Sequence, residues 1–240
     1  MKSHFFSIFL LIVLVSCEKS KDTGPVILPE LGRYSEIYTG GQFHEGPVDW
    51  EETKWTNAFG PYPEFIREIE GRYLAGLELS HNGKGEICDA CIKIETGMGK
   101  SLVLRVVTTG YTSKNSIDVS PEAYAILNSG EYPRSMSWYV TKCPSNGHNI
   151  YYQFKTDCNP WWVALWPRNV ALPIAKVEVK SAVYSEWSPL IREGDGSWVD
   201  YKGFREKPFK IRVTAIDGST VEDSYNSYVA GGLLESSGQF

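Results

Sequence analysis

The sequence has few of the residues and motifs from which metal sites and common hydrolases are built. It contains four histidines, and His44, His81 and His148 are widely separated. The Cys-x-x-Cys pair at Cys88 and Cys91 is followed by neither a second such pair nor closely spaced histidines, so we expect no metal and no other cofactor. The patterns Gly-x-Ser-x-Gly and His-Glu-x-x-His are also absent. Serine-hydrolase and zincin chemistry therefore have no support in the sequence.

The sequence also has fewer basic than acidic residues. The chain has 24 Lys and Arg against 29 Asp and Glu, which gives a net charge of -5. Binding of nucleic acid depends on Lys and Arg that neutralise phosphates, so this balance disfavours a nucleic-acid partner. The segment Gly97 to Ser101 ends like a phosphate-binding P-loop, but the first glycine of that motif would fall at Ile94. We therefore expect neither nucleic acid nor a nucleotide as ligand.

The N-terminal apolar run is too short to cross a membrane. It extends from Phe5 to Val15, whereas a membrane-spanning helix needs about 20 apolar residues. Its length and polar flanks are typical of an export signal. Residues 14–17 resemble the lipobox of bacterial lipoproteins, in which the cysteine carries the lipid. We predict a lipoprotein signal peptide over residues 1–17, a lipidated Cys17 and a tether over residues 18–35. The protein would then be exported and held at a membrane only by its lipid, facing the extracellular space or the cell surface. An ordinary secretory peptide is the alternative.

Four further cysteines remain in the exported part of the chain. An even number of cysteines in an exported protein suggests disulfides, and four cysteines allow three connectivities. We favour pairing of Cys88 with Cys91 and of Cys143 with Cys158.

Tryptophan is abundant, with eight residues, and three of them fall within Trp161 to Trp166. On a strand, Trp162 and Trp166 would point to one face and Trp161 to the other. Burial on both faces would require a partner for every indole N–H, so a row of indoles partly open to solvent is the simpler interpretation. Such a row stacks on sugar rings, and together with export it favours an extracellular carbohydrate ligand. A core strand buried on both faces or a protein–protein patch is the alternative.

The pattern along the chain predicts an all-β protein with one short helix. Alternating or β-rich runs occupy residues 73–79, 92–95, 102–107, 137–141, 150–154, 161–166, 174–180 and 209–216. Ser120 and Pro121 supply an N-cap and a first helical residue, and Gly130 closes that helix. Residues 142–147 are a boundary, beyond which evenly spaced strands suggest a β-sandwich. The first half is then a small β-rich domain, which a closed barrel would suit.

Asp118 is the strongest candidate for acid–base chemistry. It lies between apolar residues just before the predicted helix, where partial desolvation can raise the pKa of a carboxyl. A role in a turn or helix cap is the alternative. Glycoside hydrolysis normally needs a second carboxylate, for which Asp49, Glu51 and Glu52 qualify by residue type alone.

Several segments, in order, resemble the bacterial expansin-like proteins. The resemblance extends from about His44 to Tyr225 and rests on His44-Glu45-Gly46, Cys88-Asp89-Ala90-Cys91, Ser116-Ile117-Asp118-Val119-Ser120-Pro121, Trp161-Trp162 with Arg168-Asn169, and Ile211-Arg212-Val213-Thr214. It implies a six-stranded double-psi β-barrel over residues 36–142 and an immunoglobulin-like β-sandwich over residues 143–230.

The resemblance also implies a function. Expansins loosen cell-wall polysaccharide without measurable hydrolysis, and their partner is cellulose or a related β-glucan, which a monomeric protein would bind here. Asp118 matches the family's essential aspartate, Tyr111 matches a tyrosine beside it, and Trp161 and Trp162 match two of three aromatics in a linear binding row. Because strand alternation instead selects Trp162 with Trp166, we retain all three tryptophans as candidates.

Three departures from the family pattern matter. Thr109 replaces an aspartate, and Gly194 stands where the third aromatic of the row is expected, so we take Trp198 as its substitute. Asp49 aligns near a threonine of the family, and a carboxylate there would restore a catalytic base. A hydrolase of the family 45 endoglucanase type, or a lytic transglycosylase acting on peptidoglycan, is therefore the second hypothesis. A purely adhesive lipoprotein is the third.

Overall fold

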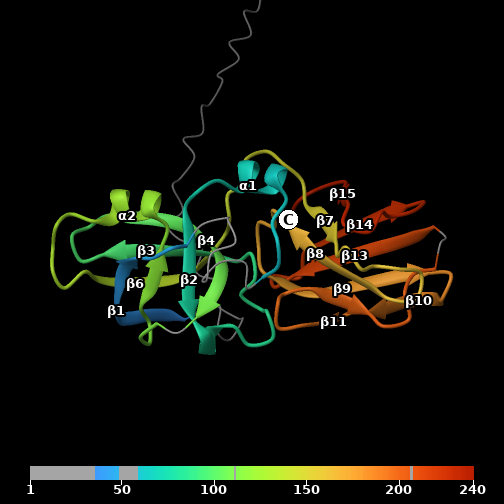
Figure 1. Ribbon diagram of the computed structural model, residues 1–240, viewed down its shortest axis with the longest axis horizontal. Helices are drawn as coiled ribbons and strands as arrows, with labels where there is room; N and C mark the ends of the chain where they lie inside the picture. Colours follow the sequence, from blue (N-terminus) through green and yellow to red (C-terminus); the bar gives the residue numbers. More distant parts are fainter. Residues whose placement is uncertain (1–35, 49–58, 111, 206–207) are drawn as a thin grey trace, which may run out of the picture.

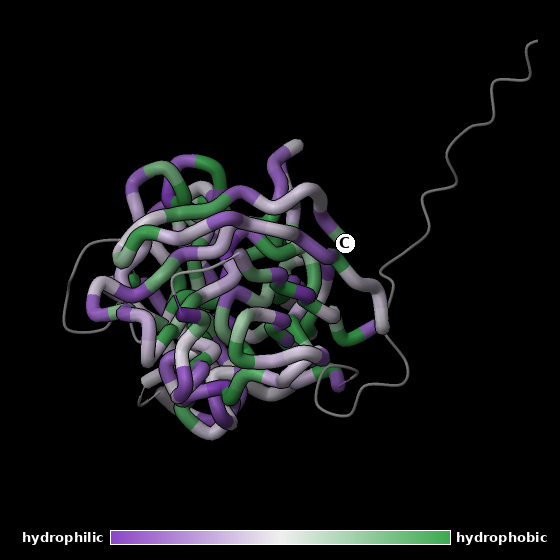
Figure 2. Tube along the Cα trace, turned by 90° about the vertical axis from the view of Figure 1, so that its right-hand side faces the viewer, coloured by the Kyte–Doolittle hydropathy of each residue, from purple (hydrophilic) through white to green (hydrophobic). Residues whose placement is uncertain are grey.

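The computed structural model describes residues 36–48, 59–110, 112–205 and 208–240. The predicted signal peptide, Cys17 and the tether lie outside these residues, as do the predicted site residues Asp49 and Tyr111. Within the described part, no helix is both long and apolar enough to cross a membrane. The tube in Figure 2 accordingly shows short apolar and polar stretches that follow one another along the chain.

The first half of the molecule is a closed barrel of six strands, in the order β1-β5-β2-β4-β3-β6. The pairs β1–β5 and β2–β4 are parallel, and the other pairs are antiparallel. The interior is filled by alternate apolar side chains of these strands, among them Phe43, Ile117 and Trp138. The strands are β1 (Ile37–Glu45), β2 (Leu74–Glu78), β3 (Cys91–Thr96), β4 (Ser101–Gly110), β5 (Ile117–Val119) and β6 (Ser135–Thr141).

Helix α2 (Pro121–Leu127) is the helix that the sequence predicted, and Ser120 caps it by accepting a hydrogen bond from the backbone N–H of Ala123 at 3.4 Å. Helix α1 (Glu64–Glu70) was not predicted, although it begins after Pro63 and buries Ile66 and Ile69. A short 3-10 helix, η2 (Leu79–His81), follows β2.

The second half is a sandwich of two antiparallel sheets. A four-stranded sheet has the order β10-β9-β13-β14, and a five-stranded sheet has the order β11-β12-β8-β7-β15. The apolar faces of both sheets form one core, which includes Val163, Leu165, Ile211 and Val213. The strands are β7 (Tyr151–Phe154), β8 (Val163–Arg168), β9 (Ile174–Ser181), β10 (Tyr184–Pro189), β11 (Ile191–Arg192), β12 (Trp198–Asp200), β13 (Phe209–Ala215), β14 (Thr220–Tyr225) and β15 (Leu233–Glu235). The barrel followed by a sandwich confirms the predicted fold class (Figure 1).

The barrel and the sandwich lie side by side and are joined by a buried ion pair. The Asp89 carboxylate, next to β3, accepts a hydrogen bond at 2.7 Å from the Arg168 guanidinium on β8, and both side chains are almost fully buried. The Asp89 carboxylate also accepts the Tyr62 hydroxyl at 2.7 Å. Glu70 accepts the backbone N–H of Asn169 at 2.7 Å and lies 3.5 Å from Arg105. We call Glu70, Asp89, Arg105 and Arg168 the junction network, because it fixes the sandwich against the barrel.

The disulfide pairing favoured from the sequence is wrong. Cys91 is bonded to Cys143, with their Cα atoms 5.1 Å apart, and Cys88 and Cys158 are free. The pairing follows from the barrel, because Cys91 on β3 is the register partner of Thr141 on β6 and Cys143 lies two residues further on. Cys88 is separated from β3 by Asp89, which has a left-handed backbone at φ 56°. The Cys158 thiol instead donates to the Ala164 carbonyl at 3.2 Å and accepts the Ala164 N–H at 3.3 Å.

Candidate functional site

Trp161 is the most open tryptophan of the predicted row, with 64% of its surface exposed. It lies in a tight turn, in which Asn159 and Trp162 form an isolated bridge and the Asn159 side chain accepts the Trp161 N–H at 2.9 Å. Strand β8 begins only at Val163, so strict alternation does not apply to Trp161. The Arg205 guanidinium lies over the indole, 3.5 Å from its ring centre. This contact supports one face of the ring.

Trp162 follows directly and is half-buried, with its ring packed against the sandwich core. Tyr201 is a neighbour that the sequence did not suggest. Strands β12 and β8 pair up to Asp200 with Val163, so the next step in this register sets Tyr201 opposite Trp162. Tyr201 is 58% exposed, and its hydroxyl donates to Glu193 at 2.8 Å.

The segment that follows Tyr201 runs against the tryptophan turn. The N–H of Arg205 donates to the Pro160 carbonyl at 3.1 Å, and a side chain at Gly203 would collide with that same carbonyl. Trp161, Trp162 and Tyr201, with Arg205 beneath Trp161, are therefore one continuous feature, which we call the aromatic platform. The resemblance directed the expected third aromatic to residues 187–194, whereas Tyr201 lies just beyond the next strand.

Trp166 and Trp198 were predicted to bind the ligand, but both are buried and lie outside the aromatic platform. Trp166 is 4% exposed and donates its indole N–H to the Asp195 carbonyl at 2.9 Å. The barrel side packs on it so closely that a side chain at Gly60 would collide with the indole. Trp198 is 6% exposed, because its strand turns the ring into the sandwich core.

Asp118 lies on the outer surface of the barrel, in a row of side chains that crosses four strands. The strand registers pair His44 on β1 with Asp118 on β5, Asp118 with Gly76 on β2, and Gly76 with Thr108 on β4. Since residues directly opposite one another share a face, these four residues form one line across the strands. We call it the Asp118 row.

Two glycines leave room beside the Asp118 carboxyl. A Cβ atom at Gly46 would lie 2.7 Å from the Cβ of Asp118, and one at Gly76 would lie 3.0 Å from the Thr108 methyl group. The contact at Gly46 is closer than real Cβ atoms come to other atoms, so a larger residue there would displace Asp118. The contact at Gly76 is tight, so a larger residue there would require a small shift of Thr108. The glycines thus keep the carboxyl within reach from outside the barrel.

The environment of Asp118 is that of a partly desolvated acid. Burial raises the pKa of the Asp118 carboxyl above its ordinary value, and the charge of His44 opposes this shift. The helix cap is Ser120 and not Asp118, so the capping interpretation of Asp118 does not hold. A half-exposed carboxyl of this kind donates or accepts hydrogen bonds according to its protonation state.

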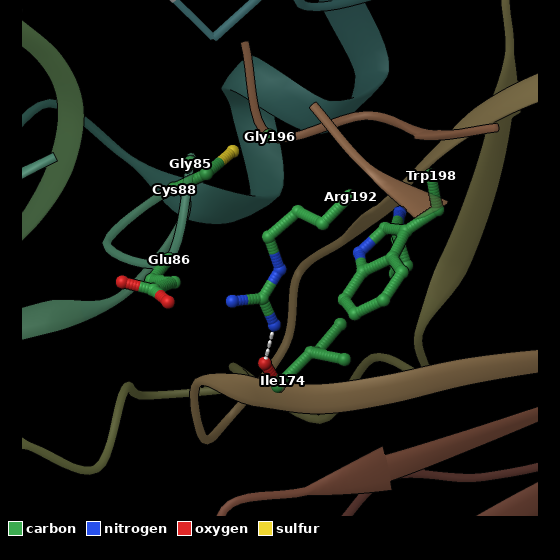
Figure 3. A pocket seen from close by; sticks show the side chains of 8 residues that line it. Gly85, Glu86, Cys88, Ile174, Arg192, Gly196 and Trp198 are labelled. Carbon is green, nitrogen blue, oxygen red and sulfur yellow. Dashed lines mark hydrogen bonds between the residues drawn. The ribbon is translucent and has the colours of Figure 1, made fainter. Parts of the chain in front are cut away.

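A separate small pocket lies where the barrel meets the sandwich (Figure 3). Gly85, Glu86 and Cys88 line it from the barrel, and Arg192 and Trp198 line it from the sandwich. The Arg192 guanidinium stacks on Trp198, 4.3 Å from the ring centre, and donates to the Ile174 carbonyl. Burial raises the pKa of the Cys88 thiol, which disfavours a reactive thiolate there. In the described residues, no group of three His, Cys, Asp or Glu side chains is placed to hold a metal ion.

We compared the sequence and the structure with those of known proteins. The chain matches no protein-family model. It is 27% identical over 193 residues to Expansin-YoaJ of Bacillus subtilis strain 168, a match that covers 75% of this chain and 77% of that protein.

Two solved structures share the fold. One is the apo expansin of Clavibacter michiganensis, with a TM-score of 0.69, 17% identity and coverage of 85% of this chain and 98% of that one. The other is a point mutant of that expansin in complex with cellohexaose, with a TM-score of 0.70, 18% identity and the same coverage. The chain is therefore a homologue of a bacterial expansin and has the barrel and sandwich of the solved bacterial expansin structures.

Proposed function

We propose that this protein binds cellulose or a related β-glucan and loosens the non-covalent packing of polysaccharide chains without hydrolysing them. The observation that carries the proposal is the exposed Trp161 ring, held flat by Arg205 beside Trp162 and Tyr201. Clustered exposed aromatic rings on a protein surface mark a binding site. The relative named Expansin-YoaJ and the related expansin bound to cellohexaose support a polysaccharide as the ligand.

The Asp118 row supplies the polar half of the proposed site. Asp118 and His44 offer hydrogen-bonding groups to the hydroxyls of a glucan chain, and the neighbouring glycines let the chain approach. The junction network holds the barrel and the sandwich in one arrangement, so a bound chain meets the platform and the row in a fixed geometry.

Loosening then follows from selective binding. A protein that binds a separated or twisted glucan chain better than a packed one shifts the population towards the separated state, with no bond broken. The size of the shift equals the difference between the two binding free energies. Tyr111, which matches a tyrosine in the same groove of expansins, would contribute to this grip. We further propose that the protein is exported, that Cys17 carries the lipid anchor, and that the barrel of residues 36–142 and the sandwich that begins at residue 143 are two domains. The predicted end of the sandwich at residue 230 is too early, because β15 (Leu233–Glu235) pairs with β7 in its five-stranded sheet.

Adsorption to insoluble cellulose tests the proposal. Trp161→Ala removes the platform's most exposed ring, and we expect at least about tenfold weaker adsorption, equivalent to about 1.4 kcal/mol. Trp187→Ala is the matched control, because Trp187 is a half-buried tryptophan on the other sheet with Arg212 over its ring at 4.3 Å. Equal adsorption of the native protein and Trp161→Ala would refute the platform. Equal losses in both variants would point to general damage to the sandwich instead.

A further inference from the structure

Tyr132 is the most exposed of the large apolar and aromatic side chains in the described part of the chain, at 84%. It lies in the loop between α2 and β6, at the end of the barrel far from the sandwich (Figure 1). A single exposed ring needs no explanation by itself. Two further observations suggest a binding role for Tyr132: Arg134 and the hydrogen bonds of the loop hold it in place, and it lies beside the end of the Asp118 row.

The ring is held by an arginine that is itself anchored. The Arg134 guanidinium lies 5.9 Å from the centre of the Tyr132 ring and 5.7 Å from that of Tyr124 on α2. Its Nε donates to the Phe43 carbonyl on β1 at 3.2 Å. Arg134 is therefore fixed between a helix and a strand, and it presents Tyr132 from a defined position.

The rest of the loop is anchored as well. Lys100 donates to the Asn128 carbonyl at 2.7 Å, and the Asn128 side chain accepts the Gly130 N–H at 3.0 Å. Glu131 accepts the Ser129 N–H at 2.8 Å. These bonds order the loop before any ligand arrives, which lowers the entropy lost on binding.

The position of Tyr132 continues the Asp118 row. Strands β1 and β6 pair at Gln42 with Ser135, and the Phe43 N–H still bonds to the Arg134 carbonyl at 3.3 Å. The next step in this register sets Pro133 opposite His44. The Tyr132 loop therefore lies two strand spacings from Asp118, roughly 10 Å.

The Asp118 row runs across the barrel from the side that faces the sandwich to the side where Tyr132 lies. Strands β4 and β2 lie on the side of the barrel that faces the sandwich, and β1 and β6 lie on the far side (Figure 1). A glucan chain that leaves the platform and follows Thr108, Gly76, Asp118 and His44 therefore arrives at Tyr132.

We propose that Tyr132, supported by Arg134, is a distal stacking subsite that extends the glucan-binding surface beyond Asp118 to the far end of the barrel. This inference rests on the proposed function. The ligand is a long, uncharged β-linked glucan, because only a long chain reaches from the platform to Tyr132. Stacking on an aromatic ring needs no charge on the ligand, and the opposite charges of Glu131 and Arg134 beside Tyr132 favour neither an anionic nor a cationic polymer.

Titration calorimetry with two probes tests the subsite: cellotriose, and a soluble mixed-linkage β-glucan of high mass. We expect Tyr132→Ala to weaken binding of the long glucan about five- to tenfold, which is the upper part of the range for one ring contact, and to leave binding of cellotriose unchanged. Tyr132→Trp should retain the affinity, because the indole also stacks. Tyr73→Ala is the matched control, since Tyr73 is also an exposed tyrosine of the barrel, at 44%, and lies outside the row.

The outcomes separate the subsite from the proposed function. Native affinity of Tyr132→Ala for the long glucan, with weakened binding by Trp161→Ala, would overturn the subsite and leave the function standing. Equal losses in Tyr132→Ala and Tyr132→Trp would also overturn it, because stacking would not be the cause. If the native protein bound neither probe nor cellulose, both proposals would fail.

Discussion

Replacement of Asp89 by asparagine should strongly destabilise the protein, because it removes the carboxylate of the junction network that pairs with Arg168. Asp89 is 1% exposed, and Arg168 is fully buried. The carboxylate bonds to Arg168 at 2.7 Å and to the Tyr62 hydroxyl at 2.7 Å. An asparagine side chain is nearly the same size as that of aspartate, so the change is chiefly one of charge and of hydrogen-bond direction.

The expected loss in unfolding free energy depends on the partners that Arg168 keeps in Asp89→Asn. Its guanidinium still donates to the Gln153 side chain at 2.9 Å and to the Phe59 carbonyl at 2.8 Å, and it lies 3.8 Å from the centre of the Tyr62 ring. The two hydrogen bonds satisfy two of the five N–H donors of the guanidinium, and none of these contacts neutralises its charge. Removing one partner of a buried pair costs about 3 to 5 kcal/mol. For a chain of this size, that lowers the Tm by roughly 6 to 20 °C.

Urea unfolding and scanning calorimetry measure this loss. Glu222→Gln is the control, because it breaks the Lys210–Glu222 pair, in which the charged atoms are 3.6 Å apart and both side chains are about half exposed. An exposed pair contributes about 0 to 1 kcal/mol, so this variant should unfold almost like the native protein. A loss below about 1 kcal/mol for Asp89→Asn would refute the view that this ion pair holds the two halves together.

Three further predictions concern titration and the disulfide. Burial raises the pKa of Glu70 from 4.5 to about 7, so the folded state keeps a proton that the unfolded state loses. Stability should therefore fall as the pH rises from about 4.5 to about 7, and urea unfolding of Glu70→Gln should show a flatter pH profile than the native protein. His44→Gln should raise the pKa of Asp118 further, since it removes an opposing charge, and an unchanged carboxyl titration by carbon-13 NMR would contradict the row. Reduction of Cys91–Cys143, which are 52 residues apart, should lower the unfolding free energy by about 4 kcal/mol, measured by urea unfolding with and without reductant.

Local patterns predicted eight of the strands and one helix, because each of these depends on neighbouring residues. They missed seven further strands of the described residues, namely β1, β5, β10, β11, β12, β14 and β15. The Ser120-Pro121 start of α2 and the alternating β9 and β13 were readable from a few residues each. The dipeptide Asn82-Gly83 is a typical hairpin signal, yet no hairpin forms there, since β2 pairs in parallel with β4. Parallel pairing of distant strands leaves no local signal.

The candidate site was partly predictable for the same reason. The resemblance identified Asp118, Trp161 and Trp162, and the structure shows Trp161 open to solvent and Asp118 partly buried. The burial of Trp166 and Trp198 could not be predicted, because it depends on packing between the halves and between the two sheets. The platform role of Tyr201 depends on a strand register that the sequence does not display.

The pairing of the cysteines also could not be predicted, because it depends on contacts between strands that are far apart in the sequence. Spacing along the chain favoured Cys88 with Cys91, whereas the neighbouring barrel strands β3 and β6 bring Cys91 to Cys143.

Release of soluble reducing sugar from amorphous cellulose, measured together with adsorption in the same tubes, distinguishes non-hydrolytic binding of cellulose from glycoside hydrolysis. We expect the native protein to adsorb and to release no sugar above the blank. Asp118→Asn should adsorb through the intact platform and likewise release none. Sugar release by the native protein that disappears in Asp118→Asn would contradict the account. It would make Asp118 the acid of a glycoside hydrolase, with Asp49 as the first partner to examine.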